Sequence, residues 1–100
     1  MQITCEKNGG DLLIAVAGRL DTKTAPELEK TLSDALPGIT ALTFDLNGLT
    51  YTSSAGLRVF LIALKTMKKQ GGTVRLINVC RDVLDILEMT GFTDLMTVES

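Results

Sequence analysis

Compact apolar segments along the chain predict five β-strands. They lie at residues 2–5, 11–17, 41–46, 73–79 and 95–98. Asn8-Gly9-Gly10 separates the first two strands and supplies residues that tolerate a positive φ, so it predicts a tight hairpin turn. Residues 18–21 close the second strand.

Apolar residues at helical spacing predict three helices between these strands. The first follows Asp21 and stops at Pro37-Gly38, and we expect Asp21, Thr22 or Thr24 to cap its free amides. The second runs from Ser54 to about Lys69 and the third from Arg81 to Met89. The apolar face predicted for the second helix consists of Leu57, Phe60, Leu61, Leu64 and Met67.

The resulting order is β-β-α-β-α-β-α-β over residues 1–100, which predicts one α/β domain. Strands joined through a single helix normally pair in parallel with right-handed crossovers, whereas a hairpin is antiparallel. We therefore expect a mixed, mostly parallel sheet with helices packed on it.

Composition excludes several kinds of chemistry. The chain has no histidine, so Ser-His-Asp catalysis, Cys-His catalysis and His-ligated metal sites are ruled out. Cys5 and Cys80 are too few for a four-cysteine zinc site. They could form a disulfide, but two thiols packed as small hydrophobes are favoured. The sequence thus indicates no catalytic residues, no metal and no cofactor.

Charge and hydropathy narrow the partners and the compartment. The net charge is -2, the pI is about 5.0 and tryptophan is absent, so no basic or aromatic surface for nucleic acid is expected. The N-terminus lacks the pattern of a signal peptide, and no apolar stretch approaches the ~20 residues that cross a bilayer. We expect a cytoplasmic protein without membrane insertion.

Residues 50–57 carry the most distinctive side chains. Thr52, Ser53 and Ser54 place three hydroxyls at the start of the second helix, where free amides and the positive end of the helix dipole gather. The simplest interpretation is that one hydroxyl caps the helix. Gly56 costs roughly 0.5–1 kcal/mol relative to alanine inside a helix, which suggests that another group approaches the backbone closely there.

Three functional interpretations of this segment remain. A nucleophilic serine would need a base, but no histidine exists and neither serine has a lysine three residues later. A phosphate-binding loop would need the G-x-x-x-x-G-K pattern, which is absent. A serine that is itself phosphorylated is compatible with the site, because the helix dipole and amides favour the added negative charge. The residue types alone do not single out this last interpretation.

Taken together, the motifs resemble those of the STAS domain, specifically of bacterial anti-sigma factor antagonists of the sporulation and general-stress type. The resemblance spans nearly the whole chain. It is carried by Gly18-Arg19-Leu20-Asp21 with Ala25, by Asp45-Leu46, by Tyr51 to Leu57, by Gly71-Gly72 and by Leu87 with Gly91-Phe92. It implies a mixed sheet flanked by helices.

The resemblance also implies partner switching in place of catalysis. In such a cycle, the unphosphorylated antagonist binds an anti-sigma factor, usually a serine kinase, and frees the sigma factor. The kinase then phosphorylates the antagonist with ATP, which releases it, and a metal-dependent serine phosphatase resets the cycle. Many members continue into a C-terminal helix, whereas this chain stops at Ser100, so we expect less complete cover of the sheet at that end.

By motif position, Ser54 is the expected phosphoacceptor, while Ser53 stands where other members carry Asp or Ser. Asp21 belongs to the loop that lies beside the phosphoserine helix in the family. Arg58, one turn after Ser54, could pair with an acidic residue of the kinase or be an ordinary solvated surface residue. The expected partner-binding residues are Asp21, Thr22, Thr52, Ser53, Ser54, Ala55, Gly56, Leu57 and Arg58. We expect a monomer or a weak dimer.

Two other functions stay open at this point. The chain could be a STAS partner-binding subunit of another complex, such as a stress-signalling assembly or an ABC lipid transporter. A small enzyme that uses Asp21, Glu27 or Asp45 is disfavoured, because these carboxylates are interpreted as caps and loop anchors.

Overall fold

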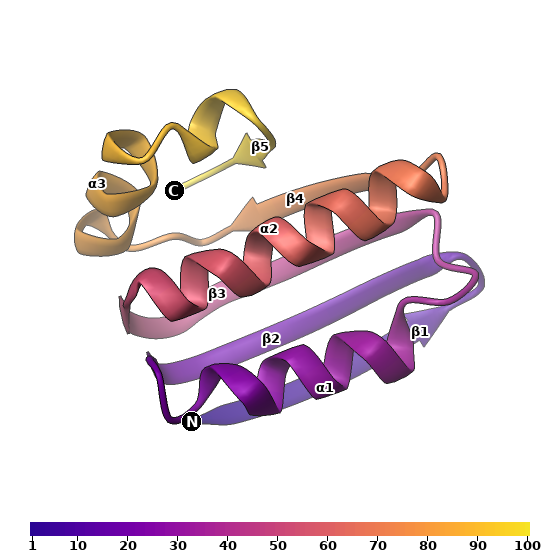
Figure 1. Cartoon of the computed structure of the whole chain (residues 1–100), viewed down its shortest axis with the longest axis horizontal. Coiled ribbons are helices and arrows are strands. Elements are labelled where there is room, and N and C mark those ends of the chain that lie inside the picture. Colours follow the sequence, from indigo (N-terminus) through magenta and orange to yellow (C-terminus); the bar gives the residue numbers. More distant parts are fainter.

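Five strands form one sheet, in the same order as they occur in the chain (Figure 1). The computed structural model describes all of residues 1–100. The strands are β1 (Gln2–Asn8), β2 (Asp11–Leu20), β3 (Ala41–Thr52), β4 (Thr73–Ile77) and β5 (Thr97–Val98). β1 pairs antiparallel with β2, and every later pair is parallel. The predicted mixed, mostly parallel sheet is confirmed.

The three α-helices lie on one face of this sheet. They are α1 (Ala25–Ala35), α2 (Ser54–Lys69) and α3 (Arg81–Met89), and a short 3-10 helix, η1 (Phe92–Asp94), follows α3. Figure 1 shows α1 and α2 side by side in front of β1, β2 and β3, with α3 beside the end of β4. The bounds predicted for α2 and α3 are confirmed.

The core lies between the sheet and the helices. Alternate residues of the central strands are buried there, and the rings of Phe44 and Phe60 meet edge to face with their centroids 5.1 Å apart. On α2 the predicted apolar face is buried except for Leu61, which is half-buried, and Val59 and Ala63 are buried as well. This single core fixes α2 against the central strands.

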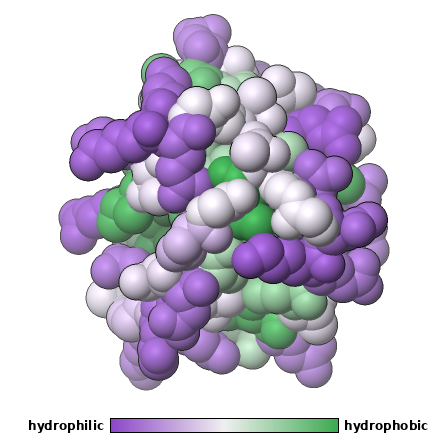
Figure 2. Space-filling view, turned by 90° about the vertical axis from the view of Figure 1, so that its right-hand side faces the viewer, coloured by the Kyte–Doolittle hydropathy of each residue, from purple (hydrophilic) through white to green (hydrophobic).

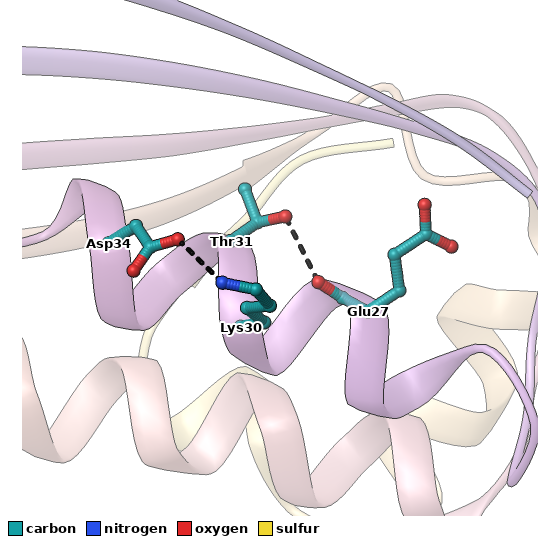
Figure 3. Close-up of polar contacts among 4 residues, drawn as sticks. All are labelled: Glu27, Lys30, Thr31 and Asp34. Atoms are coloured by element: carbon teal, nitrogen blue, oxygen red, sulfur yellow. Dashed lines mark hydrogen bonds and ion pairs between the residues drawn. The ribbon is translucent and has the colours of Figure 1, made fainter.

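The outer surface of α1 is mostly polar. On α1, Lys30 Nζ lies 3.3 Å from Asp34 Oδ2, and the Thr31 hydroxyl donates to the carbonyl of Glu27 over 3.0 Å (Figure 3). Figure 2 views the end of the molecule that carries the turns after β1 and α2. Hydrophilic side chains project over most of this end, around a smaller apolar area.

Some predicted strand limits were wrong. β3 does not stop at Leu46 but continues to Thr52, because Asn47-Gly48 forms a β-bulge and not a turn. A second register shift near Thr50 again places an extra residue in β3 opposite β2. β1 extends to Asn8, β4 ends at Ile77 and β5 contains only Thr97 and Val98.

The two cysteines are free, and the prediction that they pack as small hydrophobes was wrong because both are exposed. Cys5 lies on β1, an edge strand with no element beyond it. Cys80 occupies the N-cap position of α3, with its sulfur 3.5 Å from the carbonyl oxygen of Leu49.

Candidate functional site

The candidate site forms where β2 and β3 end and α2 begins. Leu20 and Thr52 are paired at the ends of the two parallel strands. The amide of Ser53 donates to the carbonyl of Leu20 over 2.9 Å, and α2 starts at the next residue, Ser54. Parallel strands therefore bring the Asp21 loop and the serine segment to the same edge of the sheet.

The two serines at this edge have different surroundings. Ser54, the first residue of α2, is exposed. Ser53 is the N-cap residue with an extended backbone, and its Oγ is buried without a hydrogen-bond partner in the chain. The prediction of a side-chain N-cap for α2 was wrong, because Ser53 makes no capping hydrogen bond. Of the two hydroxyls, only that of Ser54 lies on an exposed residue.

Gly56 allows α2 to approach the strand ends closely. A Cβ at this position would lie 2.7 Å from Leu20 Cγ and would also overlap Thr52 Oγ1. Thr52 is 2% exposed, and its hydroxyl donates to the carbonyl of Ser53 over 3.3 Å. The groups expected to approach Gly56 closely are therefore the side chains of Leu20 and Thr52 in the same chain. Their contact with Gly56 fixes how near the first turn of α2 lies to the strand ends.

Asp21 organises the loop between β2 and α1. Its Oδ1 accepts hydrogen bonds from the amides of Lys23 (3.0 Å) and Thr24 (3.2 Å) and lies 3.2 Å from the Thr24 hydroxyl. Asp21 thus caps the turn before α1. Thr24 occupies the N-cap position, but its side chain makes no capping hydrogen bond to α1. Of the three residues that the sequence offered as caps, Asp21 is the one whose side chain accepts amide hydrogen bonds at this end.

These contacts determine the ionisation of Asp21. Desolvation alone would raise the pKa of this carboxyl. The hydrogen bonds from Lys23 and Thr24 and the positive charge of Arg19 outweigh that effect and hold its pKa below the ordinary value. Asp21 is therefore a fixed negative charge at the site.

Arg19 and Tyr51 form a stacked pair that is not among the residues predicted for the site. They are register partners at the ends of β2 and β3, and the guanidinium carbon lies 4.2 Å from the centre of the ring. Tyr51 is 37% exposed. The sequence could have indicated this pair, because Arg19 and Tyr51 each lie two residues before a predicted site residue, Asp21 and Ser53. Residues near the ends of adjacent parallel strands lie at one edge of the sheet.

The remaining predicted residues divide into surface and interior positions. Arg58 is exposed and forms no ion pair within the chain, and Ala55 is half-buried. Gly56 and Leu57 are buried. Asp21, Thr22, Ser54 and Arg58 therefore present polar atoms outward, whereas Thr52, Gly56 and Leu57 support the site from inside.

The two other candidate carboxylates have structural places. Glu27 lies exposed in the first turn of α1. Asp45 Oδ1 accepts from the amide of Asn47 and from Asn78 Nδ2, both over 3.0 Å, and so ties the bulge of β3 to the loop after β4. No group of three or more His, Cys, Asp or Glu side chains is arranged to hold a metal ion. None of the helices combines the length and apolar character needed to cross a membrane.

Comparison with known proteins connects this geometry to a family. Residues 2–100 match the family model described as STAS domain. The anti-sigma-B factor antagonist of Bacillus subtilis (strain 168) is 28% identical over 100 residues, which span 100% of this chain and 92% of that protein.

Solved structures share the fold. An anti-sigma factor antagonist from Mycobacterium paratuberculosis superposes with a TM-score of 0.87 at 21% identity, over 98% of this chain and 84% of the other. The Bacillus protein SpoIIAA superposes in its phosphorylated form with a TM-score of 0.78 at 17% identity, over 99% and 92% of the two chains. Its unphosphorylated form gives 0.76 at 16% identity, over 99% and 87%. The chain therefore belongs to the STAS domain family and is related to its anti-sigma factor antagonists.

Proposed function

We propose that this chain is an anti-sigma factor antagonist whose binding to an anti-sigma factor is switched by phosphorylation of Ser54. The observation that carries the proposal is the contrast between the two serines. Ser54 is exposed at the start of α2, whereas Ser53 Oγ is buried. A kinase must align an acceptor hydroxyl with ATP, which requires an accessible side chain.

The start of α2 suits a phosphate. Its first turn contains no acidic residue, so the free amides and the positive dipole end face no competing carboxylate within the helix. A phosphate adds about -1.5 to -2 charges at neutral pH. Because Ser54 points outward, this charge changes the surface offered to a partner without requiring the core to rearrange.

The proposed partner surface consists of five of the predicted residues at this edge, all exposed or half-buried: Asp21, Thr22, Ser54, Ala55 and Arg58. Ser53 is left out because its hydroxyl is buried. The proposed partners are an anti-sigma factor with serine kinase activity and a metal-dependent serine phosphatase, both acting in the cytoplasm. In this scheme catalysis belongs to the partners, and the chain is a regulatory binding protein.

The site assignment is tested by incubating the protein with the anti-sigma factor kinase of its host and ATP. One phosphate, a mass increase of about 80 Da, is expected on the wild type and on Ser53→Ala, and none on Ser54→Ala. Peptide mapping should place the phosphate on Ser54. Continued phosphorylation of Ser54→Ala would overturn the assignment.

The switch itself is tested by measuring the affinity of the same kinase for Ser54→Asp. Weaker binding is expected, because the added charge loses solvent at the interface. Ser33→Asp, which adds the same charge on the exposed surface of α1, is the matched control and should bind like the wild type. Equal affinities for Ser54→Asp and the wild type would argue against charge as the switch.

A further inference from the structure

The face of the sheet opposite the helices is not covered by any other element. We call it the open face, and it lies on the far side of the sheet from α1 and α2 (Figure 1). A hollow of about 490 Å³ lies on it, between Glu6 and Asp11 at one side and Arg75 and Ile77 at the other. The side chains of β2, β3 and β4 that point to this face are half-buried or exposed. They include small or apolar residues and a few charged ones: Asp11, Leu13, Ala15, Ala17, Arg19, Ala41, Thr43, Asp45, Tyr51, Thr73, Arg75 and Ile77.

One row of register partners carries opposite charges on β1 and β4, and Thr97 of β5 continues this row past β4. Glu6 on β1 pairs in register with Leu13, Leu13 with Thr43, and Thr43 with Arg75 on β4. Adjacent strands lie ~4.8 Å apart, so the two charges stand at nearly equal distances from the line midway between β2 and β3. From β1 to β4 the row is acidic at Glu6, uncharged at Leu13 and Thr43, and basic at Arg75.

The charges on this row are complementary to those on the same row of a second copy. A two-fold axis that runs along the strands, midway between β2 and β3, turns a second copy so that its open face meets the first. Such a rotation places β1 over the second copy's β4 and β2 over its β3. Glu6 then faces the Arg75 of the second copy, and the reciprocal contact forms at the same time. An interface of this kind uses the same patch on both subunits.

Other positions on the face fit the same operation. Ala17 and Gly48 are register partners with little or no side chain, so the two sheets can approach closely beside them. Arg19 and Tyr51 are also register partners, so each Arg19 comes to face a Tyr51 of the second copy. Asp45 would be partly desolvated, but its Oδ1 already accepts hydrogen bonds from Asn47 and Asn78.

We infer that the open face is a self-association surface, through which two copies of this chain pack sheet to sheet with Glu6 opposite Arg75. The surface spans four strands and about 20–30 Å along them, so each copy covers roughly 500 Å². The total of about 1,000 Å² lies at the low end of specific interfaces, and the dimer is therefore weak. Ser54 lies at the start of α2, in the helical layer, so the dimer leaves it accessible.

Charge reversal tests the proposed pairing. Sedimentation equilibrium of the wild type from about 20 µM to 1 mM should show a monomer–dimer equilibrium that weakens with added salt. Glu6→Arg and Arg75→Glu should each weaken association about fivefold or more, because each creates two like-charge contacts per dimer. The double variant should restore association. Lys65→Glu, a charge reversal on exposed α2, should leave it unchanged.

A second control separates the dimer contact from a contact within one chain. Arg75 Nη1 lies 3.7 Å from Glu99 Oε2, and both side chains are about half exposed. Glu99→Gln removes that internal partner without reversing a charge on the open face, so it should not weaken the dimer. Loss of association in Glu99→Gln equal to that in Arg75→Glu would contradict the proposed pairing.

Dilution of the ¹⁵N-labelled wild type maps the surface without any substitution. Concentration-dependent amide shifts should centre on β2, β3 and β4, including Leu13 and Thr43. A monomer throughout the concentration range would overturn the inference. Shifts confined to the exposed edge of β1, or to the groove between α1 and α2 lined by Ile62 and Gln70, would also overturn it.

Discussion

At the scale of single residues, the conformation of the backbone explains why adjacent hydroxyls differ. Ser53 has φ −99° and ψ 179°, so the chain is still extended there, and helical geometry begins at Ser54. The change of backbone direction between them buries one side chain against the strand ends and exposes the other. The sequence motif contains both serines, but only this change of backbone conformation makes one hydroxyl buried and the other accessible.

Gly56 is a position where the surroundings reverse the usual effect of a substitution. In an ordinary helix, Gly→Ala is stabilising by about 0.5–1 kcal/mol. Here the new Cβ would overlap Thr52 and Leu20, so we expect Gly56→Ala to lower the free energy of unfolding by about 1–3 kcal/mol. Urea unfolding measures this. Ser33→Ala, at an exposed position of α1, should change stability by less than about 0.5 kcal/mol. A Gly56→Ala protein more stable than the wild type would contradict the packing described.

Asp21 should make stability depend on pH. Because its pKa is lowered in the folded chain, its contribution is present above the unfolded pKa near ~3.9 and is lost as the pH falls through the folded value. The difference in unfolding free energy between wild type and Asp21→Asn should therefore be largest at neutral pH and shrink below about pH 4. Urea unfolding at several pH values measures it.

The hydrogen bonds to Asp21 supply an independent check. Thr24→Val removes the hydroxyl that lies 3.2 Å from Asp21 Oδ1, so the pKa of Asp21 should rise toward its ordinary value. NMR titration of the Asp21 carboxyl carbon measures this directly. If the stability difference between wild type and Asp21→Asn stays constant from pH 7 to below about pH 4, the described role of the carboxylate is refuted.

At the scale of elements, helices were predicted more accurately than strands. The ends of α2 and α3 follow from local spacing and from Gly71 and Gly91, which both adopt positive φ. The end of β3 depends on pairing with β2. Asn47-Gly48 has the composition of a turn, but the register with β2 continues through two shifts to Thr52. No local pattern contains that information.

A single side chain joins the ends of α1 and α2. Gln70 Nε2 donates to the carbonyls of Leu36 over 3.0 Å and Ile39 over 2.8 Å, where α1 has ended. Gln70→Ala should lower the free energy of unfolding by about 1 kcal/mol, since each net hydrogen bond is worth about 0.5–1.5 kcal/mol and this residue is exposed.

The matched comparison is Gln70→Glu, which keeps the shape but turns a carboxylate toward the two carbonyls. It should be at least as destabilising as Gln70→Ala, whereas Lys69→Ala next to it should have little effect. Thermal unfolding followed by circular dichroism ranks the three variants. Equal stability of all three and the wild type would show that the contact contributes nothing.

At the scale of the whole molecule, the architecture and the location of the site were predictable, but its inner and outer residues were not. The order of strands and helices predicts the topology of the sheet. The position of the serine segment predicts the edge of the sheet at which the site forms. Which side chains reach solvent depends on the packing of Gly56 against Leu20 and Thr52. Leu20 is more than 30 positions away in the sequence, and Thr52 lies across the turn that precedes α2. The Arg19–Tyr51 stack likewise arises only from strand register.

The two proposed surfaces lie on different layers of the molecule and meet only at the Arg19–Tyr51 pair, which borders the site and lies on the open face. Ser54 belongs to the helical layer, and the open face is the opposite side of the sheet. A phosphate at Ser54 therefore does not touch the row from Glu6 to Arg75. Self-association and partner switching are expected to be separable by substitution, so failure of one proposal leaves the other standing.

The sequential order of the strands has a consequence for how the chain reaches its fold. Every strand pairs with the one that precedes it in the chain, from β1 to β5. A segment leaving the ribosome therefore finds its pairing partner already synthesised, and no strand has to be inserted between two others. The sheet can grow from the β1–β2 hairpin outward, one helix and strand at a time, as translation proceeds.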